Sequence, residues 1–279
     1  MLPFRKPELS KKKILIISAV LVLLIIFCWF QNNWLTADEY TFVSSKVGAA
    51  TDGYRIVQIS DLHNAVFGKE NFRLLDKIGE QQPDIIVITG DIADSNHTDL
   101  DAAIDFCRGA AKICPCYYIT GNHETWLDED EQQYLYNGIT AAGVIFLQNE
   151  TTSPADGIAM TGLDDESLYN GTLAKLSADI SSDDLHIVLA HEPQYLKEEY
   201  SHCSPDLVIT GHAHGGQIRL PFIGGLVAPD QGFFPEYTSG EYKSGNTVMY
   251  VSRGLGNSVI PLRVFNYPEI NVITIKAEK

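Results

Sequence analysis

Five short segments of this chain place metal-binding side chains directly after apolar, β-type runs. The runs cover residues 55–60, 85–89, 116–120, 186–189 and 207–210. The segments that follow them are Asp61-Leu62-His63, Gly90-Asp91, Gly121-Asn122-His123-Glu124, Ala190-His191 and Gly211-His212-Ala213-His214. Open α/β sheets build their sites at the carboxyl ends of buried strands. The pattern therefore predicts an α/β fold in which these side chains converge on one site.

The converging side chains offer enough oxygen and nitrogen donors for two metal ions. The seven donors are Asp61, His63, Asp91, Asn122, His191, His212 and His214. Asp91 is the natural bridge, because its carboxylate has one oxygen for each metal. Nitrogen and oxygen ligands without thiolates suit Mn²⁺, Fe or Zn²⁺ more than a soft metal. The donor set therefore predicts two divalent metal ions in a hydrolase site.

The order of the five segments resembles the calcineurin-like metallophosphoesterase family, whose pattern is D-x-H, G-D, G-N-H-E/D, a lone His and G-H-x-H. The match spans residues 54–279, and no ligand position departs from the pattern. Gly215-Gly216-Gln217 and Ser252-Arg253-Gly254-Leu255-Gly256 resemble the membrane-associated bacterial branch. The resemblance implies a phosphate-ester substrate. It also implies a four-layer α/β/β/α sandwich, with two mixed sheets face to face, helices outside and the metals at one edge.

The resemblance also implies how the ligands divide between the metals. It assigns Asp61, His63 and His214 to the first metal beside Asp91, and Asn122, His191 and His212 to the second. For the last two histidines of the pattern, alternation along a strand would place both side chains on one face. We therefore expect both side chains to reach the site from a strand; the alternative is a solvated β edge.

Two residues next to the ligands have predicted roles of their own. His123 matches the family's non-ligand histidine, and a histidine titrates close enough to neutral pH to protonate a departing alkoxide. The alternative for His123 is a turn residue that forms only local hydrogen bonds. Glu124 is expected to fix the tautomer of a neighbouring imidazole, as metal-site histidines usually require.

The remaining polar residues have simpler interpretations, with one exception. Histidines that match no position of the pattern are expected at the surface or satisfied in the core; they are His97, His186 and His202. An acidic cluster is expected at a helix N-terminus, which the helix dipole favours; it contains Asp94, Asp99, Asp101 and Asp105. Asp164 and Asp165 are expected in a turn. Arg253 stays open as a substrate-binding residue, because guanidinium binds phosphate bidentately.

The amino end contains an uncharged apolar run of 17 residues, 14–30, at the short end of the membrane-spanning range. Five cationic residues precede the run, and Asp38 and Glu39 follow it. The positive-inside rule then places the amino terminus in the cytoplasm and the rest of the chain outside. This predicts a single-pass cell-membrane protein with an uncleaved signal anchor. The alternative is a cleaved signal peptide, although Leu35-Thr36-Ala37 is a poor cleavage site.

These features divide the chain into four predicted parts. Residues 1–13 form a cytoplasmic basic segment, 14–33 the transmembrane anchor, 34–53 a spacer and 54–279 the metallophosphoesterase domain. Within the domain, helices are expected at 72–82, 99–111 and 131–142, and strands predominate beyond residue 151. Residues 14–279 carry 15 Lys and Arg against 35 Asp and Glu, a net charge of −20. Such an acidic domain repels anionic polymers, so we expect no nucleic acid polymer as substrate.

The four cysteines outside the apolar run leave two alternatives open. An even number of cysteines outside the cytoplasm permits disulfides, but four of them allow three pairings. They are Cys107, Cys114, Cys116 and Cys203. The sequence is equally compatible with buried free thiols and with one disulfide.

The predicted function is a membrane-anchored, dinuclear metal-dependent phosphoesterase. It would hydrolyse phosphomonoester, phosphodiester or diphosphate bonds outside the cytoplasm. One alternative is a lipid-linked nucleotide-sugar pyrophosphatase resembling UDP-diacylglucosamine hydrolases, although the predicted orientation argues against a cytoplasmic lipid substrate. The other is a metal-stabilised binding protein without catalysis, against which the complete ligand set and His123 both argue.

Overall fold

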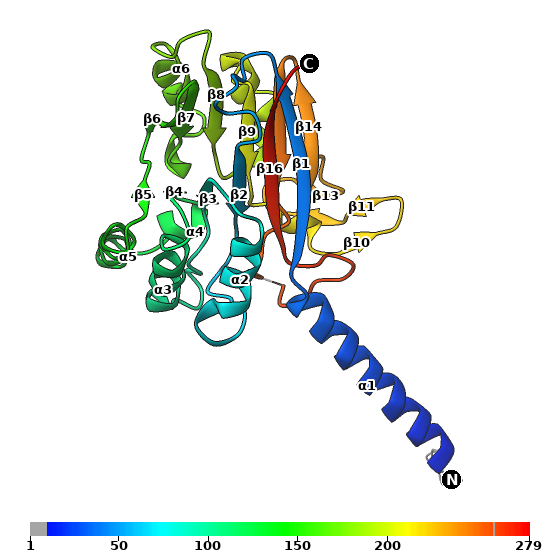
Figure 1. Ribbon diagram of the computed structural model, residues 1–279. Coiled ribbons are helices and arrows are strands. Elements are labelled where there is room, and N and C mark those ends of the chain that lie inside the picture. The colour runs from blue at the N-terminus through cyan, green and yellow to red at the C-terminus, as the bar shows by residue number, and fades with distance from the viewer. Residues whose placement is uncertain (1–9, 259) are drawn as a thin grey trace.

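A computed structural model describes residues 10–258 and 260–279, and its first element is a long, isolated helix. Helix α1 (Lys11–Asn33) begins at Ser10, whose side chain accepts a hydrogen bond from the Lys13 amide. Its side chains are apolar on all faces and mostly exposed, and it projects away from the rest of the chain (Figure 1). This one helix is long and apolar enough to cross a membrane. Residues 1–9 of the predicted basic segment lie outside the described residues.

The rest of the fold is built on two six-stranded mixed sheets. The first has the order β1 (Thr36–Ser44), β16 (Glu269–Ala277), β2 (Arg55–Ile59), β3 (Ile85–Thr89), β4 (Cys116–Ile119) and β5 (Ile145–Phe146). The second has the order β14 (Gly240–Ser244), β15 (Thr247–Val251), β9 (Leu207–Thr210), β8 (Leu185–Leu189), β7 (Ile158–Gly162) and β6 (Glu150–Ala155). Strands β2 to β5 are parallel, as are β7, β8, β9 and β15. The carboxyl ends of the parallel strands therefore share one edge in each sheet.

The central strands are continuous apolar runs because both faces of each sheet are covered. One core cluster lies between the sheets and joins Ile56, Val87 and Ile119 of the first to Ile187 and Ile209 of the second. All five side chains are fully buried. This shared core holds the two sheets together, so that the edges at which their parallel strands end lie next to each other. Loops from both sheets can then form one site.

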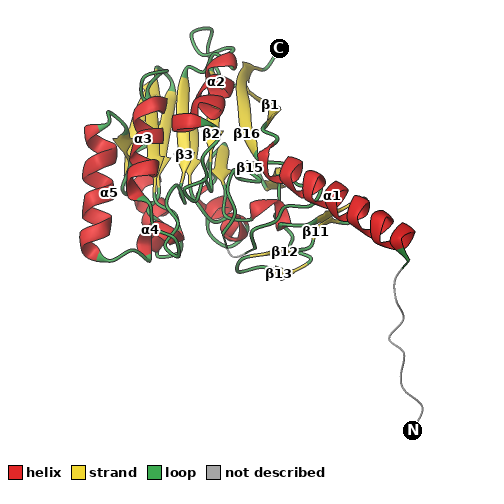
Figure 2. Ribbon diagram, turned by 90° about the horizontal axis from the view of Figure 1, so that it is seen from below, coloured by secondary structure: helices red, strands yellow, loops and turns green. Residues whose placement is uncertain are grey.

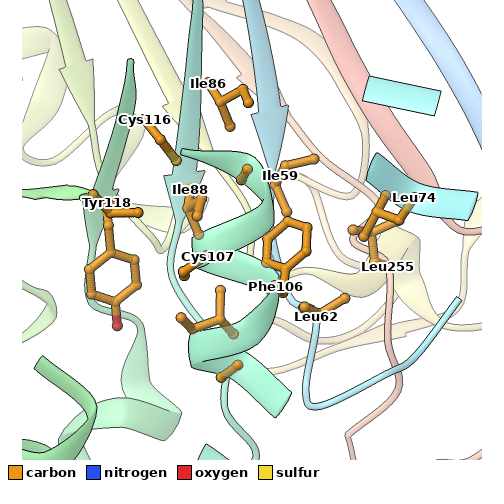
Figure 3. Close-up of a cluster of buried hydrophobic side chains, with 14 of the residues drawn as sticks. Ile59, Leu62, Leu74, Ile86, Ile88, Phe106, Cys107, Cys116, Tyr118 and Leu255 are labelled. Atoms are coloured by element: carbon orange, nitrogen blue, oxygen red, sulfur yellow. The ribbon is translucent and has the colours of Figure 1, made fainter. Parts of the chain in front are cut away.

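Helices cover the outer faces and complete the four layers. Helices α2 (Phe72–Glu80), α3 (Leu100–Ala110) and α5 (Glu129–Ala141) pack on the first sheet (Figure 2). Helix α6 (Thr172–Ser177) packs on the second sheet, where Leu173 joins the core cluster of Val188 and Val208. Figure 3 shows Phe106 and Cys107 of α3 beside Ile59, Ile88 and Cys116 of the sheet. The predicted fold class, a four-layer α/β sandwich preceded by one apolar helix, is confirmed.

The predicted spacer at 34–53 is wrong, because it contains β1. This strand pairs in parallel with β16 from Thr36 to Ser44. Tyr40 stacks against Tyr250 of the other sheet with ring centroids 4.7 Å apart. The sequence of β1 hides it, because an edge strand half-exposed to solvent carries many polar residues and has no continuous apolar run. The domain therefore begins directly after α1.

The five cysteines are all free thiols, which matches the free-thiol alternative. Cys107 of α3 and Cys116 of β4 lie in the core between that helix and the first sheet, and burial raises the pKa of both thiols. Thiols in such surroundings are unreactive.

The position of β1 predicts a difference between two truncated chains. A chain beginning at residue 34 keeps β1, whereas a chain beginning at residue 54 loses it and exposes the edge of β16. Loss of buried Phe42 alone would remove about 1.5–3 kcal/mol of unfolding free energy. Urea unfolding followed by circular dichroism should therefore show a lower midpoint for the shorter chain. Equal midpoints would mean that β1 is not part of the folded unit.

Candidate metal centre

All seven predicted ligands come together in one buried cluster at the carboxyl ends of the strands. Each of the seven side chains is less than a tenth exposed. Five of them have φ angles in the left-handed region: Asp61 (51°), His63 (44°), Asp91 (53°), His212 (64°) and His214 (47°). This conformation is rare for residues with a Cβ and concentrates at functional sites. It turns each chain segment sharply as it leaves its strand, so that the side chain points across the sheet edge.

The glycines of the pattern make this convergence possible. A Cβ on Gly90 would lie 2.6 Å from the Gly121 nitrogen and 2.7 Å from Nδ1 of His191. A Cβ on Gly121 would lie 2.3 Å from the Asp91 carboxylate. Real Cβ atoms do not approach so closely. The loops after β3 and β4 can therefore meet beside His191 only if both positions are glycine.

The expectation that His212 and His214 lie in a strand is wrong. Strand β9 ends at Thr210, and His214 belongs to a short 3₁₀ turn, His214–Gly216. Both side chains still reach the cluster, but they enter different donor groups. The left-handed backbone at both residues, rather than strand alternation, directs them.

The first donor group consists of Asp61, His63 and His214. The Nε2 atoms of His63 and His214 face one another at 3.1 Å, and His214 Nε2 lies 3.6 Å from Oδ1 of Asp61. Burial lowers the pKa of His63 to about 3 and also lowers the pKa of His214, where the charge of Arg263 adds to the effect. Both rings are therefore neutral imidazoles, the form that binds metals.

The second donor group surrounds the Asn122 amide oxygen. This oxygen lies 3.1 Å from Nε2 of His191 and 2.9 Å from Nδ1 of His212. Oδ2 of Asp91 lies 3.2 Å from Nε2 of His191 and 3.5 Å from Nε2 of His63 in the first group. The Asp91 carboxylate is therefore within reach of both groups.

The donor set and its spacing fit metal ions. An ion with bonds of about 2.0–2.2 Å to nitrogen and oxygen holds neighbouring donors about 3 Å apart, which matches the separations in both groups. The charge also fits, because Asp61 and Asp91 are fully buried carboxylates. Burial alone would raise the pKa of Asp91, but His191 and His63 beside it hold that pKa well below its usual range. The cluster can thus hold two divalent cations.

Glu124 does not contact an imidazole, so its predicted role in fixing a tautomer is wrong. Its carboxylate accepts hydrogen bonds from the backbone amides of Asp91, Ala93 and Gly121 at 2.8–2.9 Å. It therefore ties the loop after β3 to the loop after β4. Burial, reinforced by the charge of Asp91, raises the pKa of Glu124 to about 8, while the three amide bonds oppose that shift.

His123 lies at the edge of the cluster, with its ring 4.5 Å from the ring of His63. Its Nε2 is 3.1 Å from Oγ of Ser258. Its Nδ1 accepts a hydrogen bond from the Ser95 amide at 3.2 Å and lies 3.3 Å from Oδ1 of Asp94. Its contacts are not confined to the turn, because Ser258 comes from a distant loop.

Sequence reasoning missed the position of Asp94, which it placed in an acidic helix cluster. The side chain is buried beside His123, and helix α3 begins only at Leu100. Its place three residues after Asp91 was the only available signal, and that signal is weak. Asp99, by contrast, caps α3 by accepting a hydrogen bond from the Ala102 amide, as expected for a helix N-terminus.

Arg253 lies in ion pairs with two carboxylates. Its guanidinium contacts Asp38 of β1 at 2.9 Å and also contacts the buried Glu269 of β16. Its backbone amide donates to Glu269 at 2.7 Å. These contacts join the loop after β15 to the first sheet, and they account for the burial of the guanidinium. Of the other histidines, His186 is buried beside Thr161, and His97 is largely exposed.

Two cavities flank the donor groups. An apolar cavity of about 300 Å³ borders His214, and its wall contains Gln217, Val227, Ala228, Pro229, Ser258 and Ile260. A polar cavity of about 380 Å³ borders Asn122, and its wall contains Thr125, Trp126, Asp165, Glu166, Tyr169, Glu192, Gln194, Tyr195 and Asp230. Sequence reasoning placed Asp165 in a turn and did not single out Asp230. Asp165 begins a 3₁₀ turn but is buried at the cavity, and Asp230 binds Nε2 of His212 at 2.9 Å.

Comparison with known proteins supports the same chemistry. A family model described as calcineurin-like phosphoesterase matches residues 54–216. The chain is 37% identical over 269 residues to the uncharacterized metallophosphoesterase YkuE of Bacillus subtilis, covering 89% of this chain and 88% of that protein. It is 33% identical over 273 residues to the uncharacterized metallophosphoesterase Cj0846 of Campylobacter jejuni, covering 95% and 71% respectively.

A third relative is named by its reaction. The chain is 28% identical over 254 residues to the phosphodiesterase YaeI of Escherichia coli, covering 88% of this chain and 90% of that protein. The family model covers more than half of the chain and includes every predicted ligand. The chain therefore belongs to the calcineurin-like phosphoesterase family and is a metal-dependent phosphoric ester hydrolase.

Proposed function

We propose that this protein is a membrane-anchored, dinuclear phosphoesterase that hydrolyses phosphomonoester, phosphodiester or diphosphate bonds outside the cytoplasm. The observation that supports it most is the position of Asp91, whose Oδ2 lies within 3.5 Å of a histidine from each donor group. Two-metal hydrolysis needs two ions about 3.5–4 Å apart, and a carboxylate shared by the two donor groups would hold the ions close together.

Each donor group would hold one metal ion of the Mn, Fe or Zn kind, with Asp91 between them. The first metal takes Asp61, His63 and His214, and the second takes Asn122, His191 and His212. When bound, the two ions neutralise charge on the phosphoryl group and activate a water nucleophile. The chain contributes the rigid frame: Glu124 and the glycine loops fix the ligand positions before any ion binds.

His123 is placed to protonate the leaving group. In the neutral ring the Ser95 amide donates to Nδ1, so the ring proton lies on Nε2. That Nε2 points toward Ser258 at the wall of the apolar cavity. When the ring acts as an acid, Nδ1 also carries a proton, and Oδ1 of Asp94, 3.3 Å away, is placed to accept a hydrogen bond from it. His123 would therefore give its Nε2 proton to an oxygen that departs toward the apolar cavity.

The end of α1 is fixed to the loop that supports His214. The side-chain oxygen of Asn32 accepts hydrogen bonds from the Asn257 side chain and the Arg263 amide at 2.8 and 3.3 Å. Asn266 bonds to Gln31 of α1 and donates to the His214 carbonyl at 2.8 Å. If α1 spans a bilayer, these contacts hold the metal centre close to the membrane surface.

Exposed apolar residues beside α1 support this placement. The hairpin β10–β11 (Arg219–Leu220, Gly224–Gly225) lies on the same side of the domain as α1, and β12–β13 (Val227–Ala228, Gly232–Phe233) lies near it (Figures 1 and 2). These loops expose Phe222, Ile223, Phe233 and Phe234. Exposed Phe265 packs against Phe27 of α1 with ring centroids 5.7 Å apart. Aromatic residues at this level are typical of a membrane interface.

The apolar cavity favours one second candidate, a lipid-linked phosphoester or pyrophosphate substrate. Val227, Ala228, Pro229 and Ile260 line the cavity within reach of His214. The hydrocarbon part of a membrane-embedded substrate could enter there while its phosphate lies on the metals. Hydrolysis of a diacyl nucleotide-sugar substrate in detergent, with no turnover of the water-soluble nucleotide sugar, would favour this candidate over a soluble substrate.

A substitution at the shared carboxylate tests the dinuclear assignment. Asp91→Asn keeps the size of the side chain but removes its charge, so metal content should fall below two per chain. The value of kcat/KM should fall by more than about 100-fold, the upper range for residues that only support ligands. The exposed Asp179→Asn is the matched control for the loss of one carboxylate. Two metals and full activity in Asp91→Asn would contradict the assignment.

A comparison of leaving groups tests the role of His123. His123→Ala should keep both metals but lower the single-turnover rate by about 10²–10⁴-fold for an alkyl phosphoester. For a nitrophenyl ester the loss should be much smaller, because nitrophenolate departs without protonation. His202→Ala serves as a control histidine. An equal loss for both substrates would assign His123 to charge stabilisation instead, and loss of metal would make it a ligand.

The cationic residues before the apolar run of α1 and the acidic residues after it predict the orientation of the protein in the membrane. A periplasmic-type phosphatase reporter fused after Lys279 should be active, and a fluorescent reporter that folds only in the cytoplasm should not be. Replacing Lys11, Lys12 and Lys13 by Glu should reduce this bias, because cytoplasmic cations set orientation. An active cytoplasmic reporter in the unaltered chain would reverse the proposed orientation.

A further inference from the structure

The polar cavity beside the second donor group has no role in the mechanism derived so far. It borders proposed ligand Asn122, and Asp230 on its wall contacts proposed ligand His212. Whatever occupies this cavity would therefore be attached directly to a phosphoryl group held at the metals. Its volume of about 380 Å³ suits one small substituent of the phosphate.

The wall of this cavity is strongly acidic. It contains four carboxylates, Asp165, Glu166, Glu192 and Asp230, and none of its lining residues is Lys, Arg or His. Glu192 and Asp230 each place a carboxylate oxygen within 4.8 Å of the other and of a His212 ring nitrogen. Like charges at this separation repel one another unless a cation lies between them. An anionic substituent, such as a further phosphate, is therefore disfavoured.

The same wall is also aromatic. Trp126 and Tyr169 expose 64% and 58% of their surface, which is unusual for residues so large. The rings of Tyr169 and Tyr195 lie 5.3 Å apart, and the Trp126 ring is fixed 4.9 Å from His123. Aromatic faces near carboxylates form the surroundings in which proteins bind organic ammonium groups.

A buried acceptor without a partner provides an independent indication. Asp165 is only 8% exposed, and its Oδ1 has no hydrogen-bond partner. Its backbone amide bonds to Thr120, so the residue is held in place. A buried carboxylate oxygen without a donor is unfavourable, and the charge of a cation in the adjoining cavity would offset part of this cost.

A third metal ion fits the cavity less well than an organic cation. Nδ1 of His212 faces Asn122 and His191 in the second donor group. Its Nε2 must then carry the ring proton in order to donate to Asp230. Nε2 therefore offers no lone pair, and of the three clustered donors Glu192, His212 and Asp230 only the two carboxylates could bind a metal ion.

We propose that the polar cavity binds an ammonium group, primary or quaternary, carried by the alcohol that stays esterified to the phosphate. This inference rests on the proposed phosphoesterase function and names its substrate class. Water adds to phosphorus, the bond from phosphorus to the other ester oxygen breaks, and that oxygen takes the proton from His123. The proton that the attacking water loses then replaces the one that His123 gave. The products are an alcohol and a phosphate monoester of the amino alcohol.

The test compares two substrates that differ only in the charge of this group. In p-nitrophenyl phosphorylcholine the retained alcohol carries a quaternary ammonium. In p-nitrophenyl 3,3-dimethylbutyl phosphate a carbon replaces that nitrogen, so shape and leaving group are the same. With the full-length protein in detergent and Mn²⁺, kcat/KM for the cationic substrate should be at least about tenfold higher, as expected for a desolvated cation near aromatic rings and carboxylates.

Substitutions in the wall of the polar cavity test whether the preference for the cationic substrate arises there. Glu192→Gln and Tyr195→Leu should each bring the ratio of the two kcat/KM values toward one. This ratio is insensitive to general damage at the metals, because both substrates share the same chemistry. Glu198→Gln, which removes an exposed carboxylate outside the cavity, should leave the ratio unchanged. An unaltered ratio in both wall variants would place the preference elsewhere and overturn the proposal.

The outcomes separate this inference from the proposed function. Equal rates for the two substrates, or faster turnover of the neutral one, would overturn the ammonium site and leave the phosphoesterase intact. No turnover of these two phosphodiesters, of p-nitrophenyl phosphate or of a diphosphate ester by metal-loaded protein would overturn the proposed function instead, whereas turnover of the monoester or diphosphate alone would overturn only the ammonium site. Presenting the same two head groups on diacyl lipids in vesicles then identifies the source of the cation. The charge preference should hold for whichever form is hydrolysed, lipid-borne or soluble.

Discussion

The close approach of the two sheets at their strand ends is the constraint on which the site depends. Buried contacts between the sheets, such as those of Ile119 and Ile187, set the distance between the two edges. At that distance the loops after β3 and β4 can pass each other only through Gly90 and Gly121. The left-handed backbone of Asp91 then turns its carboxylate into the gap. The core, the glycines and the strained turns thus act together to bury charge where two cations can neutralise it.

Much of this arrangement could be predicted from the sequence, because the relevant signals are local. A buried parallel strand is a continuous apolar run, and the residue after it lies at the sheet edge. This is why the ligand candidates, from Asp61 to His214, could be identified together with the fold class. The same reasoning placed His212 and His214 in the site but wrongly in a strand, because no apolar pattern in the sequence reveals a left-handed turn.

The residues that could not be predicted depend on contacts between distant segments. Strand β1 is polar and half-exposed, so only its pairing with β16 identifies it as part of the domain. Glu124 binds backbone amides from three positions, and backbone amides leave no trace in a sequence. Asp94 and Asp165 resemble ordinary acidic turn residues until the fold brings them to His123 and to the polar cavity. Residue type alone cannot distinguish such positions from solvent-exposed ones.

The two cavities make the two sides of the metal centre chemically different. The apolar cavity adjoins His214, whereas the polar cavity adjoins Asn122 and carries the carboxylates and aromatic rings. A phosphoester held between them would direct its leaving group toward the apolar side and its retained group toward the acidic side. The apolar cavity is lined only by residues between β9 and β16, whereas the polar cavity also takes residues that follow β4, β7 and β8.

Crystallography with anomalous scattering from Mn²⁺ would test the central claim most directly. We expect two anomalous peaks about 3.5–4 Å apart, one on each side of the Asp91 carboxylate. One peak should lie among Asp61, His63 and His214, and the other among Asn122, His191 and His212. A single peak in the cluster, or a second peak between Glu192 and Asp230, would contradict the account of the site.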